Sequence, residues 1–385
     1  MNKLILLVFA FFIIESVSAA HFIVGEVRDS YDGVLADGKE VVLWDPTRGG
    51  IDDNLTDVIG PTGNSGTSNI YMIDCELLNK KCKVGDEIMV RSVYDGQEVN
   101  LTVTRAGYDI APNMTLNSRP NITSIEVEDS ITSPLGQIDL TPASTRDVTC
   151  EVIVEDYDGN SLQNPGSEFY SSSQGDLDDN NNHYTNNSCL INESYGNENE
   201  TQFICGFEVW YYANPGAWAC FFNVEDNLSF SGNATNTTNV NTLLSVGVQN
   251  VIDFSYVDLE KVSGEVEVNV TNYGNVATNL SLTGYAVSQG DGLAMNCTLI
   301  GNVSIENQKY NLTSPNPGTL DLGEADLVYV NMSGQTATKQ FDLDYQTEDG
   351  AEAINSTYWR VYVPLGVSGD CEGKIIFGAF QGAGS

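Results

Sequence analysis

Cysteine, histidine and a short acidic run are the residues of this 385-residue sequence whose types and spacing could do chemistry. A cysteine can act as a nucleophile, bind a metal as a thiolate or close a disulfide. A zinc site needs clustered ligands, whereas Cys75 and Cys82 stand alone as a closely spaced pair among eight cysteines. The even number of cysteines favours disulfides if the compartment is oxidising.

The amino terminus indicates that compartment. Residues 1–20 combine Lys3, an apolar run from Leu4 to Ile14 and small residues that end at Ala20. This order is typical of a secretory signal peptide, and the apolar run is too short to span a bilayer comfortably. We therefore expect an exported mature chain that begins at Ala20 or His21, has no transmembrane segment and meets an oxidising environment.

The two histidines allow one redox hypothesis. Cleavage after Ala20 would leave His21 as the terminal residue, as in the copper-binding histidine brace of lytic polysaccharide monooxygenases. A second imidazole could come only from His183, which belongs to a different predicted domain. A copper oxidoreductase is therefore kept as a remote alternative.

The acidic run suggests a weak calcium site. Asp176, Asp178, Asn180 and Asn182 place oxygen ligands at alternate positions, as in the first half of a calcium-binding loop. The expected glycine and bidentate glutamate are replaced by Asn181 and Asn187. A solvated loop is the favoured interpretation. We expect either no cofactor or a weakly bound calcium ion.

Asparagine carries a further signal. Asn-x-Ser/Thr sequons are about three times as frequent as this composition would give by chance. Asn and Thr are also common in turns and on exposed strand faces, which is the competing explanation of the sequons, but the excess favours N-glycosylation. The predicted acceptors are Asn54, Asn100, Asn113, Asn121, Asn186, Asn192, Asn199, Asn227, Asn233, Asn236, Asn269, Asn279, Asn296, Asn302, Asn311, Asn331 and Asn355.

The formal net charge of -37 limits the classes of partner that the chain can bind. Such a surface repels nucleic acid and anionic lipid. It suits a medium of high salt or of divalent cations, and we expect no nucleic-acid partner.

The elements that must position these residues are strands. Short alternating runs rich in Val, Ile, Thr and Tyr recur between Gly, Asn and Asp turns, and helical periodicity is almost absent. We predict an all-β chain of three tandem β-sandwich domains at 21–117, 118–230 and 243–385, with a linker at 231–242; the resemblances below imply immunoglobulin-like sandwiches. Three Tyr-Asp-Gly segments, which begin at Tyr31, Tyr94 and Tyr157, are interpreted as hairpin turns and not as a repeat.

The first domain resembles the carboxypeptidase-regulatory-like, transthyretin-like sandwich. The resemblance rests on Gly25-Glu26-Val27, on Asp37-Gly38 before "KEVVLW" and on "VGDEIMVRSVYDG" from Val84. It implies a β-sandwich found in many exported proteins.

The second domain resembles an immunoglobulin sandwich. Asn214, Gly216, Trp218 and Cys220 are similar to the strand F pattern, with Asn for Asp and Trp for Tyr. Cys150 within "VTCEVIV" is similar to the strand B partner, so the resemblance implies a Cys150–Cys220 disulfide. Residues 171–205 would form an Asn/Asp-rich insertion, closed by Cys189 and Cys205.

Eight cysteines allow 105 connectivities. Locality and the strand patterns favour Cys75 with Cys82, Cys150 with Cys220, Cys189 with Cys205, and Cys297 with Cys371. The alternative of Cys150 with Cys189 and Cys205 with Cys220 stays open.

The third domain resembles the Asn-x-Gly-Asn module of repeated surface and carbohydrate-enzyme-associated sandwiches, here Asn272 to Asn275. The order of signal peptide, three sandwiches and dense sequons resembles an exported archaeal-type surface protein.

The function expected from these patterns is structural or adhesive. Common hydrolase and nucleotide-binding motifs are absent from the sequence. We predict a secreted or cell-surface, glycosylated, non-enzymatic envelope protein whose partners are other envelope proteins, surface glycans or further copies of itself. The main alternative is a carbohydrate-binding module that uses Trp210, Tyr211, Tyr212 and Trp218. Such aromatics are more often core residues, and Trp210 and Tyr212 share one strand face.

Overall fold

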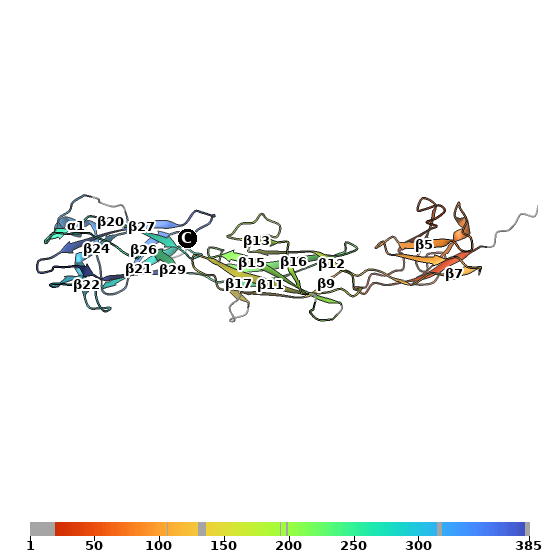
Figure 1. Ribbon diagram of the computed structural model, residues 1–385, viewed down its shortest axis with the longest axis horizontal. Coiled ribbons are helices and arrows are strands. Elements are labelled where there is room, and N and C mark those ends of the chain that lie inside the picture. The colour runs from red at the N-terminus through yellow and green to blue at the C-terminus, as the bar shows by residue number, and fades with distance from the viewer. Residues whose placement is uncertain are drawn as a thin grey trace, which may run out of the picture. The chain divides into compact units, whose positions relative to one another are not determined.

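The computed structural model describes residues 20–381, apart from 106, 130–135, 193, 198 and 314–317. The predicted signal peptide at 1–20 therefore lies outside the described residues, except for Ala20. The chain forms two compact units. The first contains residues 1–121 with the segments 155–163 and 225–232, and the second contains the remaining residues. The all-β prediction is confirmed, because almost every regular element is a strand (Figure 1).

The first unit contains two sheets. In one, β1 (Phe22–Arg28) pairs antiparallel with β4 (Ile70–Asp74) and parallel with β7 (Tyr108–Ile110) and β8 (Met114–Thr115). The other has the antiparallel order β3-β2-β5-β6. Its strands are β2 (Glu40–Trp44), β3 (Asn54–Val58), β5 (Glu87–Ser92) and β6 (Glu98–Thr102).

One apolar core joins these two sheets. Every second residue of β1 is buried, which places Ile23 and Val27 against Leu43 of β2 and Val90 of β5 in one cluster. The short helix η1 (Cys75–Leu77) follows β4 and brings Cys75 into the same cluster. The strands expected from "FIVGEVRD", "EVVLWD", "NIYMID", "DEIMVRSVYDG" and "EVNLTVT" are all present.

In the second unit, two sheets contain the Cys150–Cys220 region. One sheet has the order β14-β15-β11-β9 and the other β10-β17-β16-β12-β13. The first group is β9 (Asn121–Asp129), β11 (Thr145–Glu155), β14 (Leu190–Asn192) and β15 (Glu200–Trp210). The second is β10 (Gln137–Ile138), β12 (Leu162–Tyr170), β13 (His183–Asn186), β16 (Gly216–Asp226) and β17 (Ser231–Val240).

The remaining strands of the second unit form a six-stranded sheet and two three-stranded sheets. The large sheet contains β18 (Val246–Val248), β19 (Lys261–Val262), β20 (Val266–Asn272), β24 (Gln308–Asn311), β25 (Val330–Asn331) and β27 (Ile354–Val363). The small sheets contain β21 (Thr278–Tyr285), β26 (Ala337–Leu343) and β29 (Lys374–Gln381), and β22 (Leu293–Cys297), β23 (Asn302–Ser304) and β28 (Cys371–Glu372).

Trp359 of β27, Tyr310 of β24 and Leu282 of β21 share a buried cluster that joins the large sheet to one small sheet. The helices η2 (Ile305–Asn307) and α1 (Leu322–Val328) precede β24 and β25. Asp321 and Glu324 form a capping box at the start of α1.

The predicted linker at 231–242 is wrong for most of its length. Residues Ser231–Val240 form β17, which pairs with β16 and, through Val240, with Ile138 of β10. The strand buries Thr238 and Val240 but exposes most of its other side chains. A strand with so polar an outer face carries too few apolar residues to be recognised from its composition.

Two further expectations change. The predicted insertion at 171–205 contains β13 and β14, which pair with β12 and β15, so it is partly built into the sheets. Of the three Tyr-Asp-Gly segments, only the one at Tyr94 joins hairpin partners, β5 and β6. Those at Tyr31 and Tyr157 join strands of different sheets, although each glycine has a positive φ as the turn requires.

Candidate functional site

All eight cysteines are paired in disulfides. The pairs are Cys75–Cys82, Cys150–Cys220, Cys189–Cys205 and Cys297–Cys371. The alternative connectivity of the middle four is therefore not present. Cys150 lies on β11 and Cys220 on β16, so this disulfide links the two sheets, as the immunoglobulin resemblance implied. None of these thiols is available as a nucleophile or a metal ligand.

The acidic run is only partly a solvated loop. Asp176 and Asp178 are exposed, whereas Asn180 and Asn182 are half-buried. The Asn180 side chain donates to Asp349 Oδ1 at 2.7 Å, and Asn182 donates to Asp179. The side-chain amide of Asn180 is thus used for structure, in a contact with a loop that the sequence did not point to.

Residues 345–349 form that loop. Tyr211 donates its hydroxyl proton to Gln346 Oε1 at 2.6 Å, and Asn181 donates to the Gln346 carbonyl oxygen. Tyr212 donates to Asp349. The hydrogen bonds from Tyr212 and Asn180 lower the pKa of the Asp349 carboxyl, and burial with the adjacent Asp349 carboxylate raises the pKa of Tyr212. Several predicted binding residues therefore hold two parts of the second unit together.

Each histidine lies between acidic groups. His183 is fully buried, with Nε2 3.4 Å from Glu168 Oε2 and Nδ1 3.5 Å from Asp178 Oδ1. His21 Nε2 lies 2.7 Å from Asp109 Oδ2, and the His21 amide donates to Asp74 at 3.0 Å. His21 belongs to the first unit and His183 to the second. The His21 ring contacts Asp109 and the His183 Nε2 contacts Glu168, whereas the buried His183 Nδ1 has no hydrogen-bond partner.

The four aromatics of the carbohydrate hypothesis do not form an exposed platform. Trp218, Tyr211 and Tyr212 are buried, and Trp218 contacts the Phe169 ring at a centroid distance of 4.8 Å. Trp210 is 36% exposed and stacks on Tyr212 at 5.8 Å. A sugar ring could reach one indole face here, whereas the other three rings belong to the core.

The sequon asparagines lie mostly on exposed strand faces and turns. Four of them are half-buried, at Asn186, Asn192, Asn199 and Asn311. Asn279 is buried, with 6% of its surface exposed, and its Oδ1 accepts the amides of Phe341 and Asp342. The folded structure leaves no room for a sugar on Asn279. The exposed acceptors are Asn54, Asn100, Asn113, Asn121, Asn227, Asn233, Asn236, Asn269, Asn296, Asn302, Asn331 and Asn355.

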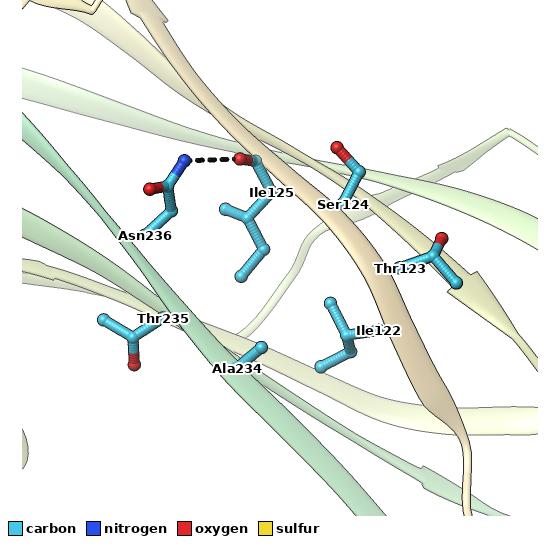
Figure 2. A pocket seen from close by; sticks show the side chains of 7 residues that line it. All are labelled: Ile122, Thr123, Ser124, Ile125, Ala234, Thr235 and Asn236. Carbon is cyan, nitrogen blue, oxygen red and sulfur yellow. Dashed lines mark hydrogen bonds between the residues drawn. The ribbon is translucent and has the colours of Figure 1, made fainter.

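An open groove of about 300 Å³ runs between β9 and β17 (Figure 2). Ile122, Ile125 and Ala234 carry apolar side chains into it. Asn236 bridges the groove by donating to the Ile125 carbonyl oxygen at 2.7 Å. The residues around it are Ile122, Thr123, Ser124, Ile125, Ala234, Thr235 and Asn236, none of which titrates near neutral pH. This lining suits apolar and hydrogen-bonding contacts and offers no general acid or base.

A second hollow of about 340 Å³ lies beside the Cys297–Cys371 disulfide and includes Asp370 and Glu372. Both carboxylates are exposed, so water screens them. Within the described part of the chain, no three His, Cys, Asp or Glu side chains are grouped closely enough to hold a metal. No helix in that same part is long and apolar enough to cross a membrane.

Two buried cations of the second unit are fully engaged. Lys309 is 1% exposed, and its Nζ donates to Asp326, to Asn331 Oδ1 at 2.7 Å and to the Glu306 carbonyl oxygen. The Arg360 guanidinium donates to Tyr329 and to two backbone carbonyl oxygens. These side chains satisfy their own donors, so they are structural, and the sequence reasoning did not single them out.

No protein-family model and no curated protein matches the chain. Among solved structures, it is similar to the major pilin subunit BcpA of Bacillus cereus, with 8% identity over 94% of this chain and 95% of that one and a TM-score of 0.30. It is also similar to the T6 backbone pilin of Streptococcus pyogenes serotype M6, with 10% identity, 93% and 96% coverage and a TM-score of 0.26. A third is a carbohydrate-binding module of the β-sandwich superfamily, with 12% identity, 69% and 98% coverage and a TM-score of 0.20.

Proposed function

We propose that this chain is an exported, surface-retained and non-enzymatic protein that serves as a structural or adhesive part of a cell envelope. The archaeal-type resemblance, the signal-peptide pattern and the sequons belong to the same proposal. The mature chain would be glycosylated and would contact other envelope proteins or further copies of itself.

The observation that carries the proposal is the complete pairing of the cysteines. Each disulfide closes within one compact unit, and together they use every thiol of the chain. Disulfides of this kind form and persist in oxidising compartments outside the cytosol. The exposure of twelve sequon asparagines at strand faces and turns adds support, because an N-linked sugar occupies the protein surface.

The carbohydrate-binding alternative has weaker support. It needs aromatic faces open to solvent, and only Trp210 among its four rings is open. The copper alternative needs a free terminal amine and a free imidazole. The backbone nitrogen of His21 instead donates to Asp74, and the His21 ring contacts Asp109.

The proposal is tested on the protein secreted from its own producing cells. Antibodies against the folded protein should label intact cells, and reducing and non-reducing mass spectra of the secreted chain should differ by eight hydrogens. Sedimentation velocity over a range of protein concentrations then separates a self-assembling component from a monomeric adhesive one.

Three results would count against the proposal. They are a chain found only in the cytosol, free thiols in the native protein, and catalytic turnover of a glycan or peptide that is lost with a single-residue change. A matched control is the same protein expressed without residues 1–20, which should accumulate inside the cell with reduced cysteines.

A further inference from the structure

Three Tyr-Asp-Gly segments far apart in the sequence converge within the first unit on residues 117–119. The carboxylate of Asp95 accepts the Asn117 amide at 2.9 Å, that of Asp158 accepts the Ser118 amide, and that of Asp32 accepts the Arg119 amide at 3.4 Å. The aspartate of each segment therefore binds one of three consecutive backbone amides.

Aromatic contacts hold the same residues together. The rings of Tyr31 and Tyr157, which open two of the segments, lie 5.9 Å apart. Tyr94, which opens the third, packs edge-on against Phe230 at 5.4 Å. All of these residues belong to the first unit, because the segments 155–163 and 225–232 are part of it. We call this cluster the Tyr-Asp-Gly junction.

Two more carboxylates are buried in the junction. Asp226 is fully buried, and its Oδ2 accepts the side-chain amide of Asn117 at 2.6 Å. Asp156 is 2% exposed, and its Oδ1 accepts the Asp158 amide at 3.0 Å. The other oxygen, Asp156 Oδ2, is buried without any hydrogen-bond partner. A buried, negatively charged oxygen without a hydrogen-bond partner lowers the stability of the fold, and native structures normally supply such a partner.

Two cationic residues lie at the junction: Arg119 is one of residues 117–119, and Lys39 Nζ lies 4.6 Å from the Tyr94 ring centroid. None of Asp32, Asp95, Asp156, Asp158 and Asp226 has a described Lys, Arg or His nitrogen within ion-pair distance. Burial raises the pKa of the Asp156 carboxyl; the amides of Asp158 and Asn160 oppose this effect, and the charges of Asp158 and Asp226 add to it. The five carboxylates therefore have no ion-pair partner among the described residues, although backbone and side-chain N–H groups donate to several of them.

We propose that the Tyr-Asp-Gly junction binds one calcium ion, with Asp156 Oδ2 as a ligand and Asp226 as the second carboxylate. Amide oxygens complete calcium sites in proteins. The Asn117 side chain contacts Asp226, the Asn160 backbone contacts Asp156, and the two asparagine side chains contact each other. Asn117 Nδ2 donates to Asp226 and Asn117 Oδ1 accepts from Asn160, so Asn117 Oδ1 reaches the ion only when both amides turn over and the bond from Asn117 to Asp226 is replaced by the ion.

The composition of this site distinguishes it from metal centres made of His, Cys, Asp and Glu alone. Two carboxylates joined by amide oxygens and water suit a hard cation with flexible coordination, and extracellular sites of that class bind calcium with a Kd of about 0.1–1 mM. Calcium is preferred over magnesium because magnesium demands near-octahedral geometry and gives up its water reluctantly.

Terbium provides the probe, because Tyr157 lies between Asp156 and Asp158 in the sequence and can sensitise its luminescence. The full mature chain is titrated with Tb³⁺ and then with competing Ca²⁺ or Mg²⁺ at neutral pH. We expect one sensitised ion per chain, displaced by Ca²⁺ at least tenfold more effectively than by Mg²⁺. Asp156→Asn should weaken Ca²⁺ binding at least tenfold.

Asp178→Asn is the matched control, because it removes one carboxylate from the competing acidic run. It should change the affinity less than twofold. Thermal melts give an independent readout. In chelator, Asp156→Asn should melt at or above the wild-type temperature, because it removes an unpaired buried charge. Millimolar Ca²⁺ should raise the melting temperature of the wild type and of Asp178→Asn but not that of Asp156→Asn.

Three results would overturn the proposal. They are a wild-type chain that binds no ion at millimolar Ca²⁺, a loss of binding with Asp178→Asn in place of Asp156→Asn, and equal calcium-dependent melting shifts in all three proteins. None of these results bears on surface location, which the cell-labelling experiment tests separately.

Discussion

At the scale of single residues, Asn279 shows how a side chain can replace a strand neighbour. The pairing of β21 with β26 shifts register between Thr278 and Leu280. Asn279 lies at that shift, and its Oδ1 accepts the backbone amides of Phe341 and Asp342 at 2.6 and 2.8 Å. A β-bulge leaves backbone groups without their usual partners, and here a side-chain amide supplies the partner.

We predict that Asn279→Ala lowers the free energy of unfolding by about 1–3 kcal/mol, because it leaves the buried Phe341 amide without an acceptor. Urea unfolding of the second unit measures the change. The control is Asn269→Ala, an exposed sequon on β20 whose loss should cost less than about 0.5 kcal/mol. Equal costs for the two variants would contradict the structural role of Asn279.

Asp291 gives a prediction for acid stability. Its carboxylate accepts the backbone amides of Val287, Leu293, Ser288 and Ala286, which lower its pKa from 3.8 to about 2. A lowered folded-state pKa stabilises the fold above the unfolded value, and this contribution is lost as the pH falls through the folded one. We expect Asp291→Asn to reduce the loss of melting temperature between roughly pH 4.5 and 2. An unchanged acid profile in that window would contradict this assignment, and exposed Asp370→Asn is the control.

At the scale of the elements, the disulfides differ in how much chain they close. Cys150 and Cys220 are 70 residues apart and link β11 to β16 across two sheets, whereas Cys75 and Cys82 are 7 apart. The chain-entropy model assigns about 4.4 kcal/mol to the long loop and about 2.5 kcal/mol to the short one.

We predict that replacing Cys150 and Cys220 with alanine destabilises the second unit. Replacing Cys75 and Cys82 with alanine should destabilise the first unit by a smaller amount. Differential scanning calorimetry, with each transition assigned by its variant, measures the two losses. A larger loss from the Cys75–Cys82 pair would show that local packing outweighs loop closure.

Strands with alternating apolar residues were predictable, and strands of mixed polarity were not. β1 and β5 alternate buried and more exposed residues along their length, so period-two patterning identified them. β17 buries few side chains and consists largely of Asn, Thr and Ser, which made it resemble a linker. β17 belongs to the sheet because it pairs with β16, and this pairing cannot be inferred from the sequence pattern of β17 alone.

At the scale of the whole molecule, the formal net charge of -37 opposes compaction. Like charges repel over a Debye length of about 30 Å at 0.01 M salt and about 3 Å at 1 M. We predict that the melting temperature rises as NaCl increases over this range, because screening relieves the repulsion. Sucrose at matched osmolality is the control, and a melting temperature that falls with NaCl would contradict the prediction.

The candidate site was less predictable than the fold. The sequence pointed to Asp176–Asn182 and to the aromatics near Trp210, and the structure uses several of these residues for internal contacts. The sequence showed the three Tyr-Asp-Gly segments, but it did not show that their aspartates meet at residues 117–119. Local turn chemistry can be inferred from short motifs, whereas the convergence of distant turns depends on the path of every strand between them.

The inter-sheet disulfide has a mechanical consequence. A covalent bridge between Cys150 and Cys220 carries tension directly from β11 to β16 when the ends of the chain are pulled. The 70 residues that it spans could otherwise lengthen by about 240 Å on full extension. While the bridge is intact, a force along the chain bypasses that segment, which also contains Cys189–Cys205, so the tether can lengthen only through residues outside the loop.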